Sequence, residues 1–186
     1  MSEVIPAILA TSASDLNLKL AKIPKEIKLV HVDVLEEDIW VDASGINFEA
    51  HLMVSRPEEI IERWVERGAK RIIVHELNEE INKFRDRVEI GLAVELDVPI
   101  EETFQLIPKV DFVHLMAIDA LGTQGDDFEP VIFDRIKKVK ETFPQMTISV
   151  DGGINKTNYQ ALENSGVDRL VVGSGFQELW KSLTRN

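Results

Sequence analysis

The chain has 186 residues, with 21 basic and 33 acidic side chains and no cysteine. The net charge of −12 argues against general nucleic-acid binding, which relies on basic patches, and disulfide or thiolate chemistry is excluded. The apolar content of 44 % is enough for a sizeable core, and the length fits one domain over residues 1–186. No apolar run approaches the ~20 residues that span a bilayer, and the N-terminus does not look like a signal peptide. We therefore expect a cytoplasmic protein that binds neither nucleic acid nor membrane.

Eight short apolar segments alternate with helical or loop segments. In chain order, the predicted strands cover residues 4–9, 29–34, 48–54, 71–75, 89–94, 111–118, 146–150 and 168–172. Such alternation is typical of a parallel sheet, and eight units favour an α/β fold of the closed (β/α)8 TIM-barrel type. An open doubly wound sheet is the alternative.

The predicted helices make this barrel unusually compact, since TIM barrels run to about 250 residues. Ser14 and Asp15 are the predicted cap of the first helix, and residues 129–143 form the best helix, with Val131, Ile132, Ile136 and Val139 on one side. No helical period follows the second strand, so that helix is expected to be missing. The helices after strands four and five are expected to be shortened. Residues 39–41 either fold back over the uncovered strands or form a subunit contact, which leaves a homo-oligomer open.

His31 and Asp33 are two residues apart on a predicted strand, so both point to the same face. Inside a barrel that face is poorly solvated, and a bound metal ion is the usual compensation for charge there. The simpler interpretation is a buried histidine–aspartate hydrogen bond. His51 and Asp151 lie near the carboxyl ends of two other predicted strands, where barrel active sites form. Two histidines and two aspartates are a plausible site for one divalent ion, zinc, iron or manganese.

Two further patterns point to proton transfer on a phosphorylated substrate. Asp33 and Asp151 come from different strands, so one could take a proton from carbon while the other returns one to the opposite face. Gly152 and Gly153 follow the seventh strand, and Gly173 and Ser174 follow the eighth, where barrels often hold a phosphate. Tight turns without a ligand are the alternative interpretation of these glycines.

At these positions the chain resembles the ribulose-phosphate 3-epimerases over nearly its whole length. The segments that carry the resemblance are Ile5-Pro6-Ala7-Ile8-Leu9, His31-Val32-Asp33-Val34, His51-Leu52-Met53-Val54, Gly91-Leu92-Ala93, His114-Leu115-Met116, Val150-Asp151-Gly152-Gly153-Ile154 and Val172-Gly173-Ser174. The resemblance implies that a metal held by His31, Asp33, His51 and Asp151 stabilises an enediolate, with Asp33 and Asp151 as the acid–base pair. It implies substrate contacts from His51, Met53, Met116, Gly122, Gly152, Gly153, Gly173 and Ser174. The implied reaction converts D-ribulose 5-phosphate to D-xylulose 5-phosphate.

Several positions depart from the family pattern. Ala7 stands where the family has serine, Leu35 replaces a methionine, and the loop Leu121-Gly122-Thr123-Gln124-Gly125 replaces a Gly-Phe-Gly-Gly sequence. An epimerase of a related ketose phosphate such as allulose 6-phosphate, or a non-catalytic phosphate-binding barrel, therefore stays open. A decarboxylase is disfavoured because Leu35 occupies the place of its lysine. His75 and His114 are expected to support the core rather than to bind metal.

Overall fold

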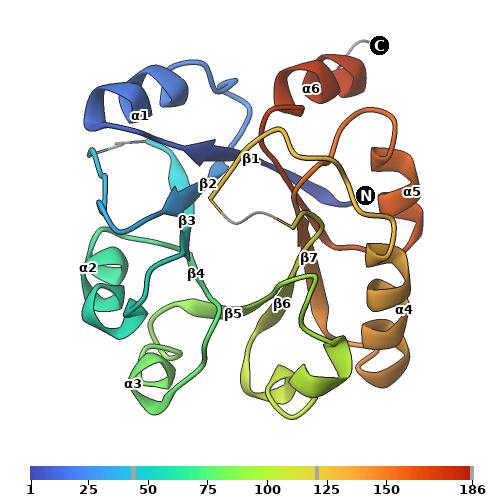
Figure 1. Cartoon of the computed structure of the whole chain (residues 1–186). Helices are drawn as coiled ribbons and strands as arrows, with labels where there is room; N and C mark the ends of the chain where they lie inside the picture. Colours follow the sequence, from blue (N-terminus) through green and yellow to red (C-terminus); the bar gives the residue numbers. More distant parts are fainter. Residues whose placement is uncertain (43–44, 120–121, 185–186) are drawn as a thin grey trace.

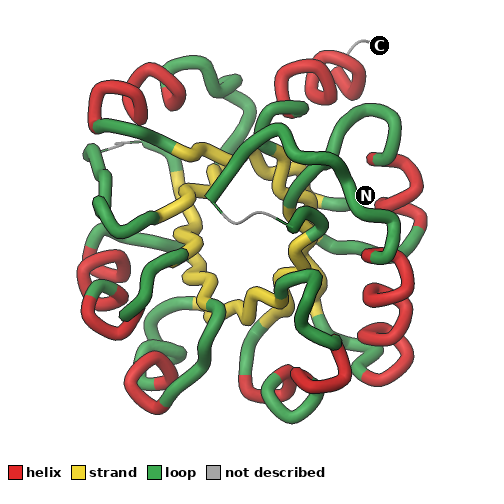
Figure 2. The backbone as a smooth tube through the Cα atoms, in the orientation of Figure 1, coloured by secondary structure: helices red, strands yellow, loops and turns green. Residues whose placement is uncertain are grey.

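The computed structural model describes residues 1–42, 45–119 and 122–184, and its centre is a closed barrel of eight parallel strands. Each strand pairs with the next one in the chain, and β8 pairs with β1. Figures 1 and 2 show the ring of strands with the helices outside it. The strands are β1 Glu3–Leu9, β2 Leu29–Val34, β3 Asn47–Leu52, β4 Arg71–Val74, β5 Glu89–Val94, β6 Phe112–Met116, β7 Thr147–Asp151 and β8 Arg169–Val172. The predicted TIM barrel is confirmed, and the open sheet is wrong.

The helices are few and short. The α-helices are α1 Ala13–Leu20, α2 Ile61–Glu66, α3 Glu79–Asn82, α4 Ile132–Thr142, α5 Tyr159–Asn164 and α6 Phe176–Thr184, and the 3₁₀ helices are η1 Pro57–Glu59, η2 Ile100–Thr103 and η3 Ile107–Lys109. The described residues between β2 and β3 form no helix, α3 has only four residues, and β5 is followed by 3₁₀ turns. The missing helix and the two shortened ones are therefore confirmed. No described helix combines the length and apolarity that a bilayer crossing requires.

The segment after β2 folds back and covers the strands that the missing helix leaves bare. The Trp40 ring lies 4.5 Å from that of Phe48 and 5.2 Å from that of Trp64, centroid to centroid. The guanidinium of Arg67 lies over both indoles, and it also forms a 2.7 Å ion pair with Asp38. This packing corresponds to the first of the two roles expected for residues 39–41.

Some predicted boundaries are wrong for local reasons. The hydroxyl of Ser12 accepts the Asp15 amide, so α1 begins before the expected cap. The Glu129 amide donates to the Ala117 carbonyl, which ties this segment to the end of β6 and delays α4 until Ile132. Val131 is consequently 52 % exposed instead of joining the apolar side of that helix.

The lower end of the barrel interior carries a ring of charges. Arg71 lies 3.0 Å from Glu49, 3.1 Å from Glu3 and 3.5 Å from Glu89, and Arg169 lies 3.0 Å from Glu89. Glu49 is buried, and a buried charge is costly unless it is paired, as it is here with Arg71. The other members of the ring are half-buried or exposed, and each lies beside an opposite charge. The ring occupies the amino-terminal ends of the strands, which leaves the carboxyl ends for the site.

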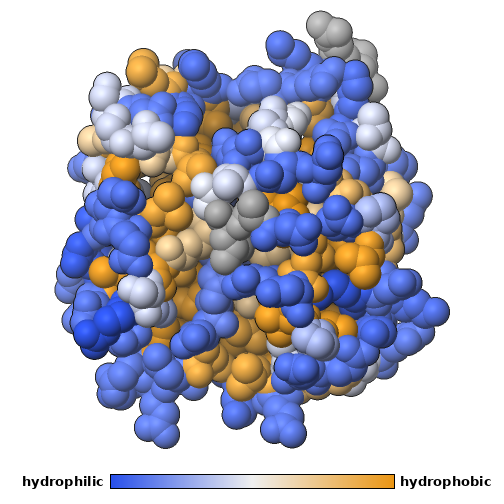
Figure 3. Space-filling model, in the orientation of Figure 1, coloured by the Kyte–Doolittle hydropathy of each residue, from blue (hydrophilic) through white to orange (hydrophobic). Residues whose placement is uncertain are grey.

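The carboxyl ends of the strands surround the mouth of the barrel. Figure 1 shows residues 122–131, which lead into α4, passing across this mouth. In Figure 3, hydrophilic residues dominate the rim of the same face, and hydrophobic residues gather inside it. Parallel pairing places Asp33 beside His51 and Met116 beside Asp151 at this level of the barrel.

Candidate active site

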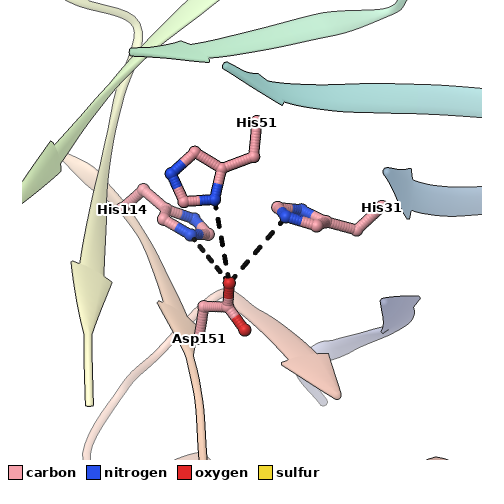
Figure 4. Close-up of side chains that lie close together, drawn as sticks. All are labelled: His31, His51, His114 and Asp151. Atoms are coloured by element: carbon pink, nitrogen blue, oxygen red, sulfur yellow. Dashed lines mark hydrogen bonds and ion pairs between the residues drawn. The ribbon is translucent and has the colours of Figure 1, made fainter. Parts of the chain in front are cut away.

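The barrel brings the four predicted metal ligands together. His31 Nε2 lies 3.2 Å from Asp33 Oδ1 and 3.8 Å from Asp151 Oδ2. His51 Nδ1 lies 3.8 Å from the same Asp33 oxygen and 4.0 Å from the same Asp151 oxygen. Figure 4 shows the imidazoles turned toward Asp151. Four side chains from β2, β3 and β7 thus point two nitrogens and two oxygens at a common centre.

This donor set fits a metal ion. His31 Nε2 and His51 Nδ1 are buried, and neither has a hydrogen-bond partner among the described residues. An unpaired buried polar atom is costly, so two of them aimed at one place indicate a missing partner. Bonds of about 2.1 Å to a first-row ion hold its ligand atoms about 3–3.5 Å apart, which is close to the separations seen here. Imidazole nitrogen and carboxylate oxygen suit zinc, iron or manganese.

Glu49 supports His31 from below. Its Oε1 accepts the Nδ1–H of His31 at 2.8 Å, and its Oε2 accepts a 3.0 Å bond from Arg71. Burial opposes the charged form of Glu49, but the His31 hydrogen bond and the nearby charges of His31 and Arg71 prevail and lower its pKa to about 2. Burial likewise opposes a charged His31, yet Asp33 and Glu49 raise its pKa well above the ordinary value. A metal-binding histidine usually has such a carboxylate on its other nitrogen.

His75 supports His51 in a similar way. The two Nε2 atoms are 2.9 Å apart, and Nδ1 of His75 lies 2.8 Å from Glu95 Oε1. Burial, followed by repulsion from His114, His31 and His75, lowers the pKa of His51 well below its usual value. His51 is therefore neutral, which is the form that binds a metal. His75 takes the supporting role expected of it.

His114 was expected only to support the core, and its position beside the candidate ligands was not foreseen from sequence. Its Nε2 lies 3.3 Å from Asp151 Oδ2, and it forms with His31, His51 and Asp151 a group whose ligand atoms all lie within 4.8 Å of one another. The signal that could have found it is parity, because His114 is two residues before Met116 and so faces the same side of its strand.

A cavity of about 490 Å³, counting the part open to solvent, lies above these side chains. All the predicted site residues except His31 line it, and His31 lies fully buried beneath. The lining residues named from sequence are Asp33, His51, Met53, Met116, Gly122, Asp151, Gly152, Gly153, Gly173 and Ser174. Ala7 also lines the cavity, so replacing the family's serine with alanine removes a hydroxyl from the site itself. Leu121 of the altered loop falls outside the described residues.

Glycines make one side of this cavity accessible to an anion. Gly152 has φ +103° and Gly153 φ +63°, which side-chain-bearing residues rarely adopt. A Cβ on Gly152 would lie 2.7 Å from the Ile118 side chain, and one on Gly153 would lie 2.6 Å from the Phe128 backbone. No lysine or arginine is among the described residues that line the cavity. Backbone amides and neutral side chains are therefore the available donors for an anion here.

Gln124 was not singled out from sequence as a site residue, yet it lines the cavity beside the glycines. Its Nε2 would lie 3.2 Å from a Cβ built on Gly173, so its side chain covers that glycine. Its amide is a neutral donor close to the backbone donors of the eighth strand's loop. The position of Gln124 depends on how the substituted loop folds over the mouth of the barrel, so it could not be read from the sequence.

The comparisons with known proteins point to one family. The profile of the Ribulose-phosphate 3 epimerase family matches residues 3–177. The ribulose-phosphate 3-epimerase of Chlamydia trachomatis is 32 % identical over 81 % of this chain and 75 % of its own length. The enzyme of Aquifex aeolicus is 30 % identical over 71 % of this chain and 64 % of its own length. The enzyme of Eremothecium gossypii is 29 % identical over 68 % of this chain and 55 % of its own length. The chain thus spans between about half and three quarters of these relatives.

Two solved structures share the fold. The 3-hexulose-6-phosphate synthase of Salmonella typhimurium has a TM-score of 0.70 at 13 % identity, covering 95 % of this chain and 90 % of its own. KGPDC from Streptococcus mutans has a TM-score of 0.66 at 13 % identity, covering 96 % of this chain and 90 % of its own. Identity this low shows the barrel alone. The family profile covers far more than half of the sequence, and the chain belongs to the ribulose-phosphate 3-epimerase family.

Proposed function

We propose that this protein epimerises carbon 3 of a phosphorylated ketose, converting D-ribulose 5-phosphate to D-xylulose 5-phosphate. The observation that carries the proposal is the convergence of Asp33 and Asp151 on two unpaired histidine nitrogens at the floor of a glycine-walled cavity. Two carboxylates from different strands suit proton transfer at two faces of one carbon, and the glycine wall suits a phosphate.

Asp33 and Asp151 would share the proton transfers. The ionised aspartate takes the proton from carbon 3, and the electron pair of the broken C–H bond forms the carbon 2–carbon 3 double bond while the carbonyl pair moves to oxygen 2. The other aspartate, protonated, then gives its proton to the opposite face of carbon 3 as the carbonyl re-forms. One proton has moved from one aspartate to the other, and exchange with water restores the starting state.

His31, Asp33, His51 and Asp151 would hold one divalent metal ion. When bound, the ion supplies positive charge that stabilises the negative oxygen of the enediolate. Glu49 and His75 orient the two imidazoles, and the buried floor excludes water from the reacting carbon. The backbone of Gly152, Gly153, Gly173 and Ser174, with the Gln124 amide, would bind the phosphate.

The test follows the hydrogen at carbon 3. Protein reconstituted with zinc, iron(II) or manganese(II) is incubated with ribulose 5-phosphate in deuterium oxide. We expect deuterium at carbon 3 and formation of xylulose 5-phosphate, and neither in the Asp151→Asn variant, whose fold is checked by circular dichroism. Binding of substrate by every metallated form without exchange or product would instead indicate a non-catalytic barrel.

A second candidate substrate is a longer ketose phosphate such as allulose 6-phosphate. A second hollow of about 610 Å³, open to solvent, shares Met53 and Gly122 with the main cavity and is bounded by Leu35, His75 and Glu95. It offers room beyond Met53 for an additional carbon. Parallel assays decide between the two, and a kcat/KM that is higher for the hexulose phosphate would favour it.

A further inference from the structure

His114 is a buried polar side chain that the proposed reaction does not use. It lies on β6, fully buried in the barrel interior, below the four candidate metal ligands. Both of its ring nitrogens have partners, since Nε2 lies 3.3 Å from Asp151 Oδ2 and Nδ1 lies 3.2 Å from Ser149 Oγ. A histidine kept in a barrel core with both nitrogens satisfied is held in one orientation.

The strand register gives His114 a single direction of approach. It pairs with Ser149, two residues before Asp151, so it reaches the carboxylate from below while the cavity lies above. Its ring is stacked on that of His31, with centroids 5.5 Å apart and planes 10° apart. Figure 4 shows His114 and His31 on two sides of the Asp151 oxygen. The ring plane and the direction of Nε2 are thus both fixed by packing.

The chemistry of the partners fixes the direction of the hydrogen bonds. An ionised carboxylate only accepts, so Nε2 of His114 carries the hydrogen and donates it to Asp151. With the ring hydrogen on Nε2, Nδ1 is left as an acceptor for the Ser149 hydroxyl. A ring nitrogen that donates to Asp151 has no lone pair left for a metal, so the positioning role and the ligand role exclude each other.

We propose that His114 is a positioning residue that fixes Asp151 with Oδ2 toward the candidate metal centre and Oδ1 toward the cavity. This inference rests on the proposed function for its kinetic consequence, whereas its effect on metal binding is independent of the reaction. Removing the Nε2 donor frees the Asp151 carboxylate to rotate and leaves Asp33 with its own contacts. The two proton transfers are therefore affected unequally.

The experiment compares His114→Leu, which removes the donor, with His114→Gln, whose amide nitrogen can replace Nε2. Ile73→Val is the packing control, because Ile73 is an interior residue that belongs to a purely apolar cluster. Thermal unfolding of the metal-free proteins establishes that each is folded. Cobalt(II) titration then reports affinity, and the visible absorption band reports the ligand set.

We expect His114→Leu to bind cobalt 10- to 100-fold more weakly with an unchanged band shape, and His114→Gln to lie within about threefold of the natural protein. An altered band in both His114 variants would make His114 a ligand and overturn the proposal. Equal affinity in His114→Leu and Ile73→Val would also overturn it.

The kinetic arm measures deuterium incorporation and inversion together. With Asp33 intact, His114→Leu is expected to exchange the carbon 3 hydrogen of one epimer at least tenfold faster than it inverts it, and His114→Gln to restore their natural ratio. An equal loss of exchange and inversion for both epimers would contradict a role specific to Asp151. If the natural protein shows no exchange at all, the proposed function fails, and the cobalt titration still tests His114.

Discussion

The Nδ1 atom of His31 lies 2.8 Å from Oε1 of Glu49, and both side chains are buried. Because Nδ1 donates to a carboxylate, Nε2 is the nitrogen left to face Asp33 and Asp151, and it would bind a metal after losing its proton. Arg71 holds the other Glu49 oxygen at 3.0 Å, so the ring of charges at the barrel floor is connected to the site above it. The lower half of the barrel thus sets the tautomer of a candidate ligand.

We predict that Glu49→Gln weakens metal binding 10- to 100-fold, since support of this kind has that effect in other metal sites. The measurement is zinc titration against a competing chelator. Glu89→Gln is the matched control, because Glu89 pairs with the same Arg71 in the same ring and is not a partner of His31. Equal affinities in the two variants would remove Glu49 from the site.

The same contact predicts how the stability of the metal-free protein depends on pH. The pKa of Glu49 is about 2 in the folded protein and 4.5 in the reference state. The ionised Glu49 therefore adds its full contribution to the free energy of unfolding above pH 4.5, and this contribution is lost as the pH falls toward 2. His31 is protonated in both states below about pH 5.5 and adds no slope there, because folding raises its pKa.

Urea unfolding of the natural protein and of Glu49→Gln therefore gives two curves that converge in acid. We expect the difference between their free energies of unfolding to narrow by about 2 kcal/mol from pH 5.5 to pH 3. If the difference between the two free energies of unfolding stays constant over this range, folding does not lower the pKa of Glu49.

The fold could be predicted because its signal is local and repeated. Eight apolar runs of strand length, separated by helical periods, define the barrel without knowledge of any contact. The same reasoning found the missing helix after β2, because residues 35–47 carry no helical period. It placed the start of α4 too early, because the Glu129–Ala117 hydrogen bond joins segments that only folding brings together.

The convergence of the four candidate ligands could be predicted from residue type and strand position. Asp33, His51 and Asp151 lie at or next to the carboxyl ends of their strands, and His31 faces the same side of its strand as Asp33. Glu49, His114 and Gln124 could not be assigned in this way, because their meaning depends on partners across the barrel.

The space that Gly152 leaves beside the proposed phosphate can be tested separately from the effect of its positive φ on stability. A Cβ there meets the Ile118 side chain at 2.7 Å and fills space beside the proposed phosphate. Gly166→Ala is the control, because Gly166 also has a positive φ of +85° but a Cβ there has room, with its nearest neighbour 3.7 Å away. We expect both alanine variants to lose about 1 kcal/mol or more of stability, and only Gly152→Ala to raise KM at least tenfold. Similar KM values for the two variants would show that the phosphate does not bind beside Gly152.

The covering segment after β2 gives the last prediction. Trp40 packs against Phe48 and Trp64 and lies beside the Arg67 guanidinium, so it fills the place that a helix takes in longer barrels. Trp40→Ala removes these contacts from a half-buried position and should cost about 2 kcal/mol, less than for a fully buried tryptophan. Urea unfolding measures this loss, and Trp180→Ala on α6, another partly buried tryptophan, is the control for removing an indole elsewhere.

The same variants test whether residues 39–41 form a subunit contact. We expect sedimentation to give one mass for both variants and the natural protein, because Trp40 covers its own chain. A mass that falls only in Trp40→Ala would assign the segment to a subunit contact.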